Sequence, residues 1–118
     1  MNESAPQLLV WSTVDDADSA RRLADGVVGA GLAACVNILP PVTSVFRWEP
    51  GEGDAAAAAV QAEQEVLLLI KTSSAAYPAL ERHLRAEHPY ELPEIIAVPI
   101  TQGLDAFRQW IDDTTQGG

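Results

Sequence analysis

The chain has 118 residues, of which 47% are hydrophobic and 20% are charged, a composition typical of a folded globular domain. It carries 17 acidic and only 7 basic residues, so its formal net charge is −10. This balance repels phosphate backbones and argues against a nucleic-acid partner. The single cysteine, Cys35, excludes an internal disulfide and a CxxC redox pair.

The N-terminal residues and the hydropathy pattern predict neither a secretory signal nor a membrane span. Residues 1–6 contain no basic segment and no apolar segment. The longest strongly apolar run, residues 66–70, is far shorter than the roughly 18 residues that a membrane helix requires. We therefore expect a cytoplasmic protein of one domain, residues 1–118, without a membrane partner.

Hydrophobic periodicity predicts strand, helix and strand for the first half of the chain. Residues 7–13 are apolar and predict a buried strand, whereas residues 20–28 show the spacing of one helix face. A second strand is predicted from about residue 33 to 48, broken at Pro40-Pro41. Residues 50–62 are rich in turn-forming residues and alanine, so we expect a flexible hairpin insert there.

The second half of the chain repeats this order. Residues 65–72 predict a strand whose lack of alternation indicates that both of its faces are covered. Further elements are predicted in this order: a helix opened by Ser73-Ser74 and Pro78 and ended by Pro89, a strand at 94–100, and a short helix at 104–111.

The predicted order is βαββαβ with one helix appended, which is the α+β ferredoxin-like sandwich with an extra C-terminal helix. In that fold strands two and four form the edges of the sheet, where Pro40-Pro41 and Pro99 are tolerated. The core is expected to span about residues 7–113. Because helices cover only one face of such a sheet, the other face needs a partner, and the simplest partner is another copy of the chain.

The most unusual segment runs from His88 to Glu94 and holds an imidazole, a phenol and carboxylates between two prolines. These groups suit a cation or a polar ligand, but they also suit a rigid connection with solvated charges. Lys71, the only lysine, is either solvated at its strand end or paired with Glu91 or Glu94 in a cleft. Cys35 is expected to be an inert, buried side chain. No catalytic motif stands out.

Several segments together resemble the CutA family of divalent-cation tolerance proteins, over about residues 8–111. They are Ala33 to Asn37, Ser44 to Glu49, Lys71-Thr72, His88 to Glu94 and Trp110. The resemblance implies a tight homotrimer, similar to the PII signalling proteins, with a link to copper and other divalent metal ions. It also implies a ligand-binding cleft between subunits, formed by Cys35, Trp48, Lys71, Tyr90, Glu91 and Glu94.

The resemblance further implies a metal site at His88, with Glu87 and Glu91 as weaker candidates. Copper-binding members have a cysteine before the threonine of strand one and a histidine pair before the Pro-Tyr. This chain has Ser12-Thr13 and Glu87-His88 at those positions. We therefore expect weak Cu²⁺ binding, roughly micromolar or worse, and no organic cofactor.

Two other functions remain open at the level of sequence. One is an enzyme whose cleft is formed by Lys71, Tyr90, Glu91 and Glu94. The other is a PII-like regulatory or scaffolding trimer. A strongly perturbed pKa in a concave site would favour the enzyme.

Overall fold

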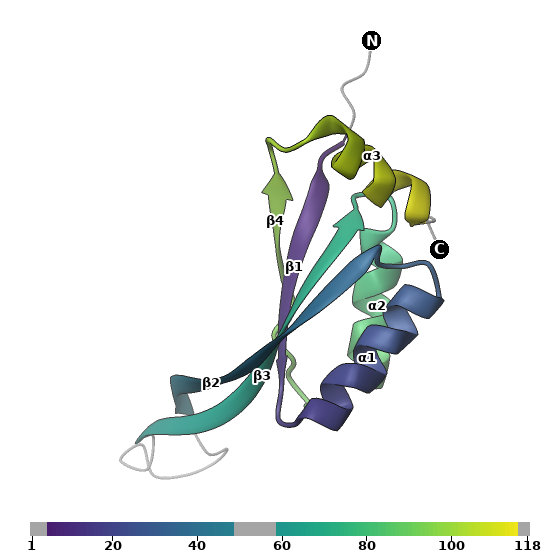
Figure 1. Cartoon of the computed structure of the whole chain (residues 1–118). Coiled ribbons are helices and arrows are strands. Elements are labelled where there is room, and N and C mark those ends of the chain that lie inside the picture. The colour runs from purple at the N-terminus through teal and green to yellow at the C-terminus, as the bar shows by residue number, and fades with distance from the viewer. Residues whose placement is uncertain (1–4, 49–58, 116–118) are drawn as a thin grey trace.

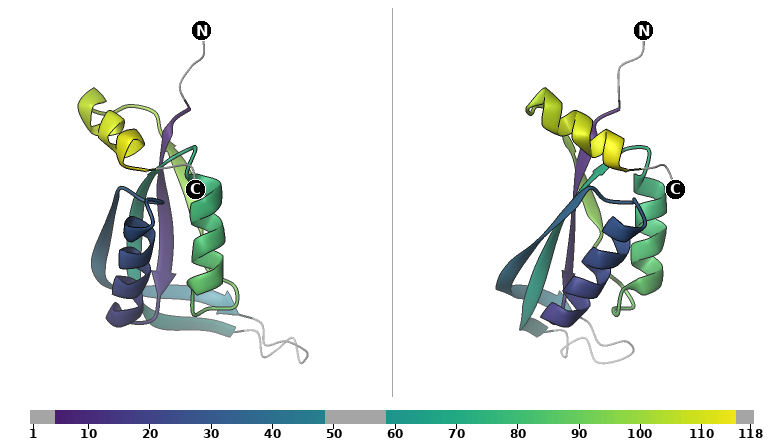
Figure 2. Two further views of the ribbon diagram at one scale, coloured as in Figure 1. Left: turned by 90° about the vertical axis from the view of Figure 1, so that its right-hand side faces the viewer. Right: turned by 45° about the vertical axis from the view of Figure 1, so that its right-hand side comes forward.

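The computed structural model describes residues 5–48 and 59–115 as a four-stranded antiparallel sheet with three helices (Figure 1). The elements are β1 (Gln7–Val14), α1 (Ala17–Gly29), β2 (Cys35–Trp48), β3 (Ala59–Ser73), α2 (Tyr77–Glu87), β4 (Ile96–Ile100) and α3 (Asp105–Thr114). Helices α1 and α2 cover one face of the sheet, and α3 lies across one end (Figure 2). The predicted α+β ferredoxin-like fold with an extra C-terminal helix is confirmed.

The strand order β2-β3-β1-β4 confirms the predicted edges and centre of the sheet. Pro40-Pro41 falls in edge strand β2, where the pairing with β3 shifts register between Leu39 and Val42. Pro99 falls in the other edge strand, β4. Proline donates no backbone hydrogen bond, and an edge strand has one side on which no donor is needed.

The core lies between the two helices and the sheet. Side chains alternate along a strand, so Val10, Leu68 and Ile70 all face the helices and are at most 1% exposed. Leu23 of α1 and Leu80 of α2 pack against them. Burial of each such side chain contributes about 1.5–3 kcal/mol to folding.

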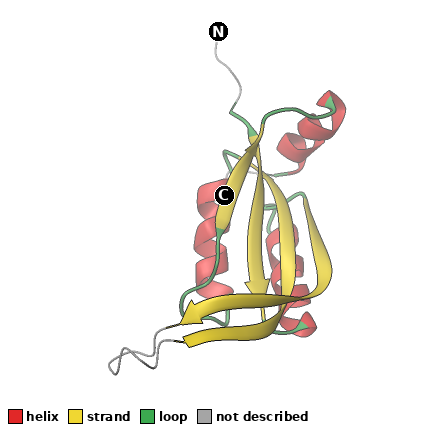
Figure 3. Ribbon diagram, turned by 90° about the vertical axis from the view of Figure 1, so that its left-hand side faces the viewer, coloured by secondary structure: helices red, strands yellow, loops and turns green. Residues whose placement is uncertain are grey.

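The same alternation leaves apolar residues on the opposite face of the sheet. Leu9, Trp11, Leu67 and Leu69 lie on this face and are half-buried. Figure 3 looks onto this face and shows that none of the three helices covers it. It is called the open face below.

The middle hairpin differs from the prediction, because β3 begins at Ala59 instead of Glu65. Residues 59–65 pair with residues 42–48 and form a two-stranded arm that turns away from the other strands (Figure 3). The predicted insert at 50–62 is therefore too long at its C-terminal end, and its residues 50–58 lie outside the described residues. The hydrogen bonds between paired strands come from the backbone, so polar residues and alanine can extend a strand. The hydrophobicity of the sequence does not reveal such an extension.

Helix α2 also begins later than predicted, at Tyr77. The hydroxyl of Ser73 accepts a hydrogen bond from the backbone N–H of Ala76 at 3.2 Å, which holds a turn before the helix instead of capping it. Pro78 lies in the first helical turn, as expected.

Helix α3 is attached to the end of the sheet by one buried apolar side chain and by polar contacts. Ile111 is fully buried. The side-chain amide of Gln7 donates to Asp112 at 2.9 Å, and the hydroxyl of Thr115 donates to Ser73 at 2.7 Å. None of the described helices has the length and the apolar character needed to cross a membrane.

Candidate functional site

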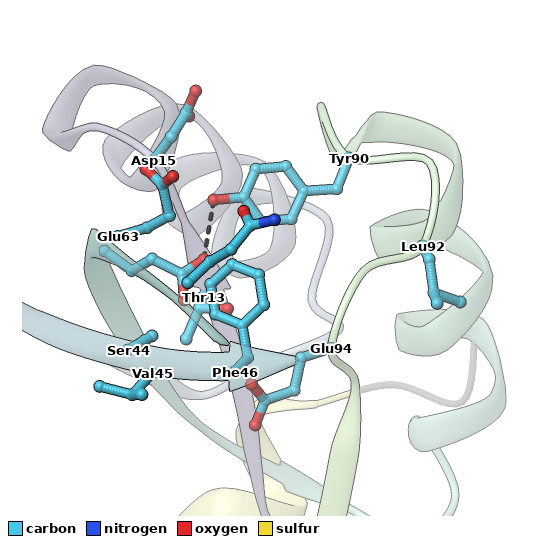
Figure 4. A pocket seen from close by; sticks show the side chains of 11 residues that line it. Thr13, Asp15, Ser44, Val45, Phe46, Glu63, Tyr90, Leu92 and Glu94 are labelled. Atoms are coloured by element: carbon cyan, nitrogen blue, oxygen red, sulfur yellow. Dashed lines mark hydrogen bonds between the residues drawn. The ribbon is translucent and has the colours of Figure 1, made fainter. Parts of the chain in front are cut away.

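A cavity of about 630 Å³ lies between the arm and the segment that connects α2 to β4 (Figure 4). It is called the acidic cavity below, and its walls come from the end of β1, from both strands of the arm and from residues 90–94. The lining residues are Thr13, Asp15, Ser44, Val45, Phe46, Gln61, Glu63, Glu65, Tyr90, Leu92 and Glu94. They include four carboxylates and no lysine, arginine or histidine.

The pairing of the arm determines which of its side chains line the cavity. Ser44 pairs with Glu63, and Phe46 pairs with Gln61. Directly paired residues point to the same side of an antiparallel ladder, so these four side chains share one face of the arm. The sequence interpretation missed Glu63 because it began the strand too late, at Glu65, and it assigned Glu65 to no site. Alternation of Gln61, Glu63 and Glu65 along the chain was the signal that would have placed them together.

Tyr90 joins the loop to the arm across the cavity. Its hydroxyl donates to Oε2 of Glu65 at 2.8 Å (Figure 4). Burial, together with the hydrogen bond to Glu65, raises the pKa of Tyr90 well above its usual value, so the hydroxyl keeps its proton. The phenol is therefore a fixed, neutral donor that bonds one oxygen of Glu65 and brings no positive charge to the site.

His88 is buried behind this wall, with 8% of its surface exposed, and both of its ring nitrogens have protein partners. Nδ1 accepts from the backbone N–H of Tyr90 at 3.0 Å. Nε2 lies 2.9 Å from the carbonyl oxygen of Thr13, which can only accept, so we assign the proton to Nε2. Burial lowers the pKa of His88, while the Thr13 carbonyl and the charges of Asp15 and Glu65 oppose this shift.

Within the described residues of one chain, the groups of the metal site implied at His88 do not come together. A metal ion needs the lone pair of an imidazole nitrogen, and that of Nδ1 is already used by Tyr90. Glu87 and Glu91 are exposed. Ser12, at the position of the family cysteine, is fully buried, and its hydroxyl has no partner among the described residues. In residues 5–48 and 59–115, no three His, Cys, Asp or Glu side chains are grouped so that they could hold a metal ion.

The predicted ligand cleft is divided between two ends of the sheet. Tyr90 and Glu94 line the acidic cavity. Lys71 is six positions from Glu65 on β3, which corresponds to roughly 20 Å along a strand. Its ammonium donates to the side-chain oxygen of Asn37 at 2.5 Å and lies 3.8 Å from the sulfur of Cys35.

Glu91, another residue of the predicted cleft, does not line the acidic cavity. Glu91 borders a smaller hollow on the side of α2, together with Arg85. Trp48 ends β2, and its side chain lies outside the described part of the molecule. A single chain thus brings together Tyr90 and Glu94 from the predicted set, and separately Lys71 and Cys35.

Comparisons with known proteins agree with the resemblance. A family model described as CutA1 divalent ion tolerance protein matches residues 8–114. The chain is 42% identical over 107 residues to the divalent-cation tolerance protein CutA of Thermus thermophilus, covering 91% of this chain and 96% of that protein. The crystal structure of CutA1 from Oryza sativa matches with a TM-score of 0.86 at 36% identity, covering 98% of both chains.

Two further relatives overturn the predicted cytoplasmic location. The chain is 37% identical over 115 residues to a CutA protein of Arabidopsis thaliana named as chloroplastic, covering 98% of this chain and 59% of that protein. The CutA structure from Archaeoglobus fulgidus is described as periplasmic, and it matches with a TM-score of 0.82 at 32% identity, covering 93% of this chain and 99% of that chain. The chain therefore spans little more than half of the plant protein, and these two relatives are named for compartments other than the cytoplasm.

Proposed function

Because the chain belongs to the CutA family of divalent ion tolerance proteins, we propose that it acts in divalent-cation tolerance as a binding protein that takes up a cation in the acidic cavity. The supporting observation is the lining of this cavity, in which four carboxylates face no cationic side chain. The net charge of −10 adds a negative potential over the whole molecule. A concave site within such a field concentrates cations.

The donor chemistry of the cavity favours hard cations over copper. Its walls offer carboxylate, hydroxyl and amide oxygens. Such ligands suit Mg²⁺, Ca²⁺ and Mn²⁺, whereas Cu²⁺ favours nitrogen and sulfur ligands. Copper binding through His88 would break one of the two hydrogen bonds of the imidazole. We therefore propose that Cu²⁺ binds weakly, roughly at micromolar affinity or worse.

We also propose that the chain assembles as a homotrimer through the open face, as the family resemblance implies. Besides the half-buried residues of β1 and β3, Ile96 and Val98 on β4 are 54% and 43% exposed. An obligate interface that covers these side chains would bury on the order of 2,000 Å² or more. Light scattering that found a folded monomer at micromolar concentration would contradict the trimer.

The binding function is tested by calorimetric titration with Mg²⁺, Mn²⁺ and Cu²⁺. We expect Glu63→Gln to weaken binding of Mg²⁺ or Mn²⁺ severalfold, because it removes one cavity charge and keeps the side-chain shape. Asp113→Asn is the matched control, since Asp113 is an exposed carboxylate on α3 away from the cavity. Equal losses in both variants would show diffuse attraction to an acidic surface and would refute a site in the cavity.

A further inference from the structure

We propose that the preferred occupant of the acidic cavity is an organic cation, with an ammonium group on a short apolar stem, and not a bare metal ion. This inference rests on the proposed function of cation binding at the same site and names the chemical class of the ligand. It is carried by the spread of the carboxylates, by the aromatic and apolar walls, and by the hydroxyl of Thr13 at the cavity wall.

The carboxylates do not gather around one point, so a metal ion in the cavity would meet only one or two of them. They come from the turn after β1, from two positions on β3 and from the segment before β4, in the residues Asp15, Glu63, Glu65 and Glu94. A bare divalent ion needs about six oxygens at roughly 2.0–2.6 Å. The described residues contain no cluster of three or more ionisable ligands that could do this. Acidic groups spread around a cavity instead suit a charge that is carried on a larger molecule.

The size and the walls of the cavity also favour an organic ligand. A volume of about 630 Å³ falls within the range of roughly 300–1,000 Å³ that is usual for small-molecule sites. Phe46 and Tyr90 contribute rings to the walls, and Val45 and Leu92 contribute aliphatic side chains that are 66% and 75% exposed (Figure 4). A cation close to an aromatic face is attracted by the ring electrons, and a hydrocarbon stem packs against aliphatic side chains.

The hydroxyl of Thr13 is a polar group of the cavity wall that is independent of the four carboxylates. The residue is only 7% exposed, it lines the cavity, and it lies on the side of β1 opposite to the buried Ser12 and Val14. Its carbonyl oxygen interacts with His88, but within residues 5–48 and 59–115 its hydroxyl has no hydrogen-bond partner. This oxygen is not among the fully buried, unpaired side-chain atoms of the described residues, so it is open to the cavity and available to accept an N–H from an ammonium group.

The hydrogen bonds of Tyr90 keep the wall in place before any ligand arrives. Its hydroxyl donates to Glu65, and its backbone N–H donates to His88. The ring therefore has little freedom to move into the cavity. A wall fixed in this way lowers the ordering cost of binding.

The experiment uses diaminobutane as the probe, with butanediol as its neutral counterpart and Mg²⁺ as the metal, each titrated into the full chain by calorimetry. We expect diaminobutane to bind, butanediol not to bind, and Mg²⁺ to bind more weakly than the diamine. Phe46→Leu keeps an apolar wall but removes the ring, so it should weaken diamine binding about two- to fivefold. Asp113→Asn should leave it within about twofold.

The possible outcomes separate this inference from the proposed function. Binding of Mg²⁺ that depends on Glu63, without binding of diaminobutane, would overturn the inference and leave the proposed function standing. Failure of both probes to bind would refute both. Diamine binding that is unchanged in Phe46→Leu, or that is reduced as much in Asp113→Asn as in Phe46→Leu, would overturn the inference. Either result would show that the diamine is attracted to the acidic surface in general. Circular dichroism and light scattering of each variant confirm that fold and assembly are intact.

Discussion

Replacement of His88 by alanine tests whether this imidazole is a structural element or a metal ligand. In the structure it connects the end of β1 to the loop through the carbonyl of Thr13 and the N–H of Tyr90. His88→Ala leaves both backbone groups without these partners in a buried place. Each loss costs about 1–3 kcal/mol, so the free energy of unfolding should fall by roughly 2–6 kcal/mol.

The assay is urea denaturation at neutral pH in the presence of a chelator, at one fixed protein concentration because assembly contributes to stability. His83→Ala is the matched control, since it replaces the other histidine, which is half-buried on α2. We expect the control to lose less than about 1 kcal/mol. If His88→Ala lost no more stability than His83→Ala, and instead lost its Cu²⁺ affinity, the structural role would be refuted.

The same variant tests the pH dependence of stability. Burial lowers the pKa of His88 below its ordinary value of 6.5, so the unfolded chain takes up this proton at a higher pH than the folded chain. The contribution of His88 is therefore fully present above pH 6.5 and is lost as the pH falls from there through the folded-state pKa. The slope from this residue is at most about 1.4 kcal/mol per pH unit. It should be absent in His88→Ala and retained in His83→Ala.

Three further variants test the core and the open face. Ser12→Ala removes a buried hydroxyl that has no partner among the described residues, so thermal melting should show equal or higher stability, and a clear loss would reveal a partner. Thr72→Val removes the donor to the carbonyl of Leu32 at 2.7 Å and should cost about 1–3 kcal/mol in urea denaturation. Leu69→Glu places a charge on the open face and should abolish the trimer in light scattering, whereas a persistent trimer would show that this face is not the interface.

The strand order was predictable because two independent patterns agree. Apolar runs mark the central strands, and Pro40-Pro41 and Pro99 mark the edges. The helices were predictable from spacing, since the same pattern that places Leu23 and Val27 on one face of α1 also buries them. Each of these signals is local: apolar spacing reports which residues face the core, and proline reports where a backbone donor is not needed.

The arm was not predictable from hydrophobicity, because its residues do not face the core. Gln61, Glu63 and Glu65 alternate with Ala62 and Gln64 along a strand that extends beyond β1, whose last partner on β3 is Val66. Backbone pairing and a few polar side-chain contacts, such as that from Gln64 to Thr43, hold this segment, so hydrophobic patterns report on it poorly. The register shift at Pro40-Pro41 marks where the arm begins but does not determine its direction.

The candidate site shows why closeness in sequence was a poor guide to closeness in space. Residues 87–94 place several ligand-type groups in one short segment, but successive side chains there point in different directions. His88 points into the protein, Tyr90 faces the cavity, and Glu91 faces the side of α2. The carboxylate that Tyr90 contacts, Glu65, comes from a strand 25 positions earlier in the chain. A loop stiffened by prolines cannot fold around an ion by itself. The acidic cavity forms because residues of the arm lie opposite residues 90–94 of that loop.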